Sequence, residues 1–134
     1  MTRPARIPRD VPGRANRPDP KRDKRHLAFI RTLPCFACGR TGYSEAAHVR
    51  SGTDGGVGTK PSDRWSLPLC CGPEGCHATQ HRVGELAFYS DLRIDPLSVA
   101  EALHRVSGDR AKADRVLFRA WQSMELKRQE ARHG

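Results

Sequence analysis

The stretch that decides the fold begins at Cys35-Phe36-Ala37-Cys38, continues through Ala46-Ala47-His48-Val49-Arg50, and ends with Cys70-Cys71 and Cys76-His77-Ala78-Thr79-Gln80-His81. It contains all five cysteines and three of the six histidines of the 134-residue chain. It is poor in the Leu, Ile, Val and Phe residues that build hydrophobic cores. We therefore predict that a bound metal stabilises this segment and that metal also takes part in its chemistry.

The cysteines fall into two groups with the spacing of a structural zinc site. Cys35 and Cys38 flank a tight turn followed by a glycine, which is the form of a zinc knuckle. Downstream cysteines can complete a tetrahedron of four thiolates. Cys70 and Cys71 are adjacent and project in different directions, so only one of them is expected to bind the ion. The gap to Cys76 slightly favours Cys71.

Three histidines are candidates for the chemistry. The segment that ends at His48 is predicted to be a short strand, and a glycine-rich loop follows it. The segment from Cys76 is predicted to be a helix that places His77 and His81 on one face. Two imidazoles so placed can bind one divalent cation, or one can bind metal while the other contacts phosphate. The alternative is that both are solvated.

Charge points to a polyanionic partner. The formal net charge is +9, the isoelectric point is about 10.0 and the mean hydropathy is −0.69. Such a chain has room for one compact domain and favours nucleic-acid contact, although a merely soluble basic protein is the simpler alternative. The odd number of cysteines argues against a complete disulfide framework and suits a reducing, cytoplasmic location. We expect neither a secretion signal nor a membrane span.

The chain divides into three predicted parts. Residues 1–25 carry five of the ten prolines and nine Arg or Lys residues, which predicts a disordered basic arm that either aids solubility or follows a phosphate backbone. Residues 26–90 are predicted to form the metal-binding domain, which opens with a short helix over 26–33 and includes one helix over 76–89. His26 is expected to be a surface or phosphate-facing residue rather than a metal ligand. Residues 91–134 form a C-terminal helical extension that packs on the core. Its first helix starts at Asp95-Pro96, and its last helix starts near residue 110 and is expected to fray over 127–132.

Taken together, the segments resemble the HNH endonucleases. The resemblance covers roughly residues 33–90 and is closest to the phage and prophage group of RecA-dependent, Ref-type nucleases. It is carried by Ala46-Ala47-His48-Val49-Arg50, Gly58-Thr59-Lys60-Pro61-Ser62-Asp63, Pro68-Leu69-Cys70 and Cys76-His77 with His81. The resemblance implies an α+β fold with a small, zinc-stapled, treble-clef-like ββα-metal core. It also favours Cys70 over Cys71, so the expected zinc ligands are Cys35, Cys38, Cys70 and Cys76.

The resemblance also implies roles for individual residues. His48 would be the general base, and Asp63 would orient it or reach the catalytic ion. His77 would bind that ion, which is Mg²⁺, Mn²⁺, Ni²⁺ or Zn²⁺, and His81 would bind the ion or hold the scissile phosphate. Arg50, Lys60 and Arg82 would contact the nucleic acid. Many members have an acidic or histidine ligand where this chain has Ala47.

The expected function is metal-dependent hydrolysis of DNA phosphodiester bonds. DNA is the expected substrate, and by resemblance a recombinase filament is a further expected partner. The alternative is a zinc-stapled nucleic-acid-binding module without turnover. A strand-end histidine opposite a helical histidine pair is not needed for binding alone, which favours the nuclease.

Overall fold

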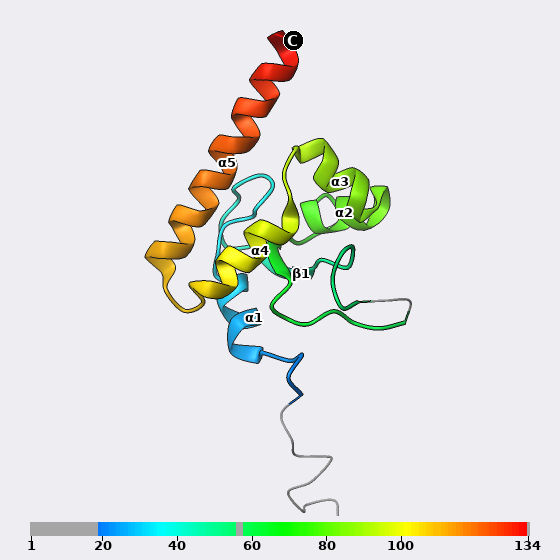
Figure 1. Cartoon of the computed structure of the whole chain (residues 1–134), viewed down its shortest axis with the longest axis vertical. Coiled ribbons are helices and arrows are strands. Elements are labelled where there is room, and N and C mark those ends of the chain that lie inside the picture. Colours follow the sequence, from blue (N-terminus) through cyan, green and yellow to red (C-terminus); the bar gives the residue numbers. More distant parts are fainter. Residues whose placement is uncertain (1–18, 56–57, 134) are drawn as a thin grey trace, which may run out of the picture.

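The computed structural model describes residues 19–55 and 58–133. The elements follow in the order α1 (Lys24–Arg31), β1 (Ser44–His48), β2 (Ser66–Cys70), α2 (Cys76–Val83), α3 (Glu85–Leu92), α4 (Pro96–Arg105) and α5 (Arg110–His133) (Figure 1). The described residues thus form five helices and one two-stranded sheet, which confirms the α+β class. Within them, no helix is both long enough and apolar enough to cross a membrane.

The sheet is an antiparallel pair that connects the histidine and cysteine segments. In its register, Ser44 lies opposite Cys70 and His48 lies opposite Ser66. Every residue of β2 is buried, so its sequence lacks the alternation that identifies a half-exposed strand, and it contains Pro68. Both strands of a two-stranded sheet are edge strands, where proline is tolerated. The hairpin therefore carries His48 at one end and Cys70 at the other.

The first helix begins earlier than predicted and holds a buried histidine. The Asp23 carboxylate caps α1 by accepting the backbone N–H of His26 at 3.0 Å. The prediction that His26 lies at the surface is wrong: the residue is 1% exposed, and its Nδ1 lies 2.7 Å from Ser107 Oγ. That contact joins residues 81 positions apart, so it could not be read from the local sequence.

The single helix predicted over residues 76–89 is two helices. Gly84 has a φ of 94°, a left-handed conformation that a residue with a side chain rarely adopts, and it separates α2 from α3. The predicted start of α4 is confirmed, since Asp95 caps the helix by accepting the backbone N–H of Leu97 at 3.0 Å. The last helix is continuous to His133, where fraying was expected.

An apolar core lies between α1, the sheet, α4 and α5. Its largest fully buried side chains include Phe36, Ile30, Leu67, Leu103 and Leu117. In contrast, Gln80 is the one buried residue that α2 contributes. The helix that carries His77 and His81 is therefore attached to the molecule by something other than apolar packing.

Candidate metal centre and histidine cleft

Four cysteines converge on one point. The sulfur atoms of Cys35, Cys38, Cys70 and Cys76 all lie within 4.8 Å of one another. The Cys38 and Cys70 sulfurs are 3.7 Å apart. Zinc–sulfur bonds of about 2.3 Å in a tetrahedron place the sulfurs about 3.8 Å apart, so the separation fits a shared ion and is too long for a disulfide. The donor set and its spacing fit a structural metal, as predicted.

The structure also distinguishes the two adjacent cysteines. Cys70, the last residue of β2, is buried within the cluster, whereas Cys71 lies outside it and is partly exposed. The chain then turns tightly to return to Cys76, the first residue of α2. A side chain at Gly75 would collide with the carbonyl oxygens of Cys70 and Cys71, so this turn requires glycine.

Burial disfavours the charged thiolate form of the clustered cysteines when no metal is bound. It raises the pKa of the Cys35 and Cys76 thiols. At Cys70 burial acts in the same direction, but hydrogen bonds from the backbone N–H and thiol of Cys76 outweigh it and lower the pKa of that thiol. A central divalent cation favours the thiolate form of all four, which is the chemistry a zinc site uses.

His48 and Asp63 form a hydrogen-bonded pair at the other end of the hairpin. His48 Nε2 lies 2.8 Å from Asp63 Oδ1, and the His48 side chain is 17% exposed while Asp63 is buried. Two residues that precede α1 also donate hydrogen bonds to the Asp63 carboxylate. Arg22 Nη1 donates to Oδ1 at 2.9 Å, and the backbone N–H of Asp23 donates to Oδ2 at 2.7 Å.

These contacts determine the proton positions in the pair. Burial opposes ionisation of Asp63, but the hydrogen bonds from His48 and the Asp23 backbone, together with the Arg22 charge, outweigh it and hold its pKa below the ordinary value of 3.8. An ionised carboxylate only accepts hydrogen bonds, so His48 donates through Nε2–H. In the neutral imidazole, Nδ1 is then the basic nitrogen.

His77 and His81 lie opposite this pair, on α2. Their Nε2 atoms are 3.1 Å apart. Two nitrogens bound to one ion at about 2.0–2.1 Å are separated by roughly 2.8–3.0 Å in octahedral and roughly 3.3–3.4 Å in tetrahedral geometry, so a separation of 3.1 Å is compatible with a shared ion. His77 Nδ1 lies 3.4 Å from Glu45 Oε1 on β1, a contact that orients the ring.

Asp63 does not join the histidine pair in the structure. Both of its oxygens are engaged by His48, Arg22 and Asp23, below the surface. Among the described residues, the cysteine cluster is the one group of three or more His, Cys, Asp or Glu side chains that could hold a metal ion. An ion at His77 and His81 would therefore take its remaining ligands from water or substrate, and imidazole nitrogens are ligands that suit Zn²⁺ or Ni²⁺.

The three histidines line one cleft of about 580 Å³. Its lining includes His48, His77 and His81 together with two basic residues, Arg50 and Lys60. Arg82, predicted to contact nucleic acid, is exposed on α2 but is not part of this lining. The cleft therefore combines a basic nitrogen, a histidine pair and positive charge.

Glu85 fixes one rim of the cleft. Its carboxylate accepts the backbone N–H groups of Arg50 and Ser51 at 2.8–3.0 Å. The break at Gly84 places this residue at the start of α3, facing the chain that leaves β1. The contact holds Arg50 beside the end of β1, so Glu85 is a positioning residue for the cleft.

Sequence reasoning gave no role to Arg22, Glu45 or Glu85. Arg22 falls within the segment predicted to be a disordered arm, most of which lies outside the described residues. Its guanidinium nevertheless holds Asp63 and the carbonyl oxygen of Pro61, at 2.9 and 2.7 Å. These partners lie about 40 positions away in the sequence, and no local pattern marks such a pairing.

No protein-family model, no curated protein and no solved structure matches this chain.

Proposed function

We propose that this protein is a metal-dependent endonuclease of the HNH type that hydrolyses DNA phosphodiester bonds. The observation that carries the proposal is the His48 and Asp63 pair at the edge of a basic cleft that also holds His77 and His81. The β1, β2, α2 order and the cysteine cluster support it, since they provide a strand-end histidine, a facing helix and a metal centre that braces them.

In the proposed reaction, His48 activates water. Asp63 keeps the proton on Nε2 and stabilises the imidazolium that forms, so Nδ1 can take a proton from a water molecule in the cleft. The water oxygen attacks phosphorus, the bond to the leaving oxygen breaks, and that oxygen acquires a proton from solvent. Removing a positioned general base of this kind lowers rates by about 10²- to 10⁴-fold.

The remaining residues of the cleft neutralise charge. Arg50 and Lys60 lie where a phosphate backbone crossing the cleft would need compensation. His77 and His81 would hold the divalent ion, with Glu45 orienting His77. When bound, such an ion supplies charge stabilisation at the leaving oxygen.

Plasmid nicking tests the proposal. Supercoiled plasmid is incubated with purified protein and Mg²⁺, Mn²⁺ or Ni²⁺, and the nicked and linear forms are measured with time. The matched variants are His48→Ala in the cleft and His133→Ala at the exposed end of α5, outside it. We expect His48→Ala to lose nicking by about 10²- to 10⁴-fold and His133→Ala to keep it.

The outcomes separate the two functions considered from the sequence. Metal-dependent nicking that is lost in His48→Ala supports the enzyme. DNA binding without nicking under any of the three ions, or equal nicking by both variants, would contradict it and leave a binding module as the remaining interpretation.

A further inference from the structure

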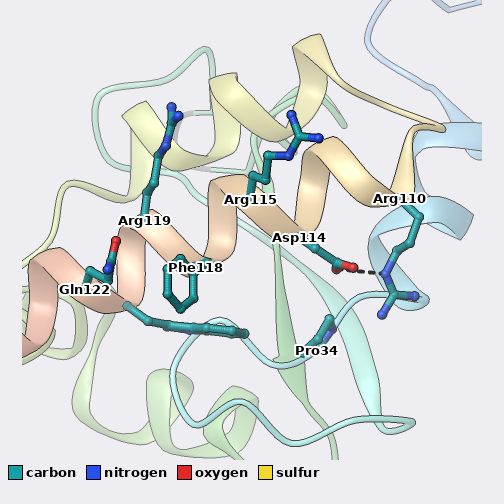
Figure 2. Close-up of a pocket in the computed structure, with 8 residues that line it drawn as sticks. Pro34, Arg110, Asp114, Arg115, Phe118, Arg119 and Gln122 are labelled. Atoms are coloured by element: carbon teal, nitrogen blue, oxygen red, sulfur yellow. Dashed lines mark hydrogen bonds and ion pairs between the residues drawn. The ribbon is translucent and has the colours of Figure 1, made fainter.

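The outer face of α5 carries a second surface, which we call the arginine–aromatic surface. It is formed by Arg115, Phe118, Arg119 and Trp121 of α5 with Pro34, and it surrounds a hollow of about 570 Å³. Figure 2 shows Phe118 on this face, with Arg115 and Arg119 to one side and Pro34 to the other. None of these residues lines the His48 cleft.

The packing of α5 does not account for this surface. The residues that α5 buries against the core are Ala113, Leu117, Ala120 and Met124. Phe118 lies off that stripe and is 58% exposed. The indole of Trp121 is fixed, because its Nε1–H donates to the Phe36 carbonyl oxygen at 2.8 Å. A rigid indole and an open phenyl ring beside one hollow are suited to receive a flat or apolar group.

The charge of the surface indicates which charge a molecule bound there should carry. Arg110 and Asp114 neutralise each other through a 2.9 Å contact, which Figure 2 draws as a dashed line. Arg115 and Arg119 are exposed, and no ion pair to either is found in the part of the chain that the structure describes. The occupant should therefore be anionic. The chain's own first 18 residues are a poor candidate, since they carry five arginines and one aspartate.

We propose that the arginine–aromatic surface binds single-stranded nucleic acid. A single strand offers phosphates to the two arginines and an unstacked base to the rings, and base stacking on an aromatic side chain contributes about 1–3 kcal/mol per base. A duplex keeps its bases inside the stack and cannot make this contact. The lining of this surface shares no residue with the lining of the His48 cleft, so its role is additional to the proposed cleavage site.

Fluorescence anisotropy with a labelled oligothymidine of about 20 nucleotides tests the proposal. The protein carries His48→Ala, so that failure of the nuclease proposal does not affect the outcome. The test variant is Phe118→Ala. The matched control is Leu126→Ala, which removes another exposed apolar side chain of α5 outside the surface. Both side chains are exposed, so both variants should fold.

We expect Phe118→Ala to weaken oligothymidine binding by about 5- to 150-fold, while Leu126→Ala has no effect. Replacing Arg115 or Arg119 by Ala should reduce the slope of log affinity against log salt by about 0.7 each. Equal binding by Phe118→Ala and Leu126→Ala would overturn the proposal. So would equal losses for a duplex of the same length, or binding of an acidic, aromatic-rich peptide in place of the oligonucleotide.

Discussion

Loss of the metal should release α2 while leaving the rest of the core folded. This helix has eight residues, and Gln80 is its one buried residue. Ordering eight residues costs roughly 8–16 kcal/mol in backbone entropy, and an isolated helix of this length is marginal in water. Val83, its largest apolar side chain, is 47% exposed and contributes little. A structural zinc contributes about 10–16 kcal/mol, which is the size needed to hold the helix.

Cys38→Ser is the sharpest perturbation, because Cys38 is exposed and its replacement should leave the apolar core intact. Cys71→Ser is the matched control, since Cys71 is the cysteine outside the cluster. We expect about one zinc per chain in the control and little in Cys38→Ser. Hydrogen exchange should become fast over residues 76–83 in Cys38→Ser, while the buried stripe of α5 stays protected.

Two results would refute this reasoning. If Cys38→Ser retains zinc as Cys71→Ser does, the ligand set is wrong. If the zinc-free protein keeps α2 protected from exchange, then contacts other than the metal centre stabilise the helix.

Two further predictions concern the supports of the cleft. Asp63→Asn should lower the free energy of unfolding by about 2–3 kcal/mol at pH 6, because a buried acceptor of three hydrogen bonds loses its charge. The folded pKa of Asp63 lies below the ordinary value of 3.8, so the stabilisation by its charge is complete above pH 3.8 and is lost as the pH falls through the folded pKa. The free energies of unfolding of wild type and Asp63→Asn, measured in urea, should therefore differ less at pH 3 than at pH 6. Glu85→Ala should weaken substrate binding more than it slows turnover, because it frees the backbone that holds Arg50 but leaves His48 in place. Equal effects of Glu85→Ala and of a substitution at exposed Leu86 would assign no positioning role to the carboxylate.

Local features of the fold could be predicted from the sequence. The C-x-x-C spacing, the Asp95-Pro96 helix start and the i, i+4 histidine pair each depend on residues that are close in the chain, and the structure brings each of them together. Cys70 required more than spacing. In the structure, Cys70 ends β2 opposite Ser44 and belongs to the cluster, while Cys71 follows it outside the cluster and is partly exposed.

Features that depend on distant partners could not be predicted. β2 is buried at all five positions, so it shows no period of two, and only its pairing with β1 makes it a strand. The helix break at Gly84 follows from a positive φ that the apolar pattern does not record. The burial of His26 depends on Ser107, and the charge state of Asp63 depends on Arg22, in a segment whose composition predicts disorder.

The two sites are not independent, because α2 belongs to both. Its first residue, Cys76, supplies a sulfur to the metal centre. The next residue, His77, contacts Glu45 on β1. The hairpin in turn carries Cys70 at one end and His48 at the other. A metal at the cysteines thus fixes the distance between His48 on the sheet and His77 on the helix. In the proposed reaction these two side chains would have to be held to within about 0.5 Å of a productive geometry. Because Gln80 is the one buried residue of α2, we expect the metal centre to contribute most of this precision, together with the contacts of His77 and Glu85 to the chain around β1.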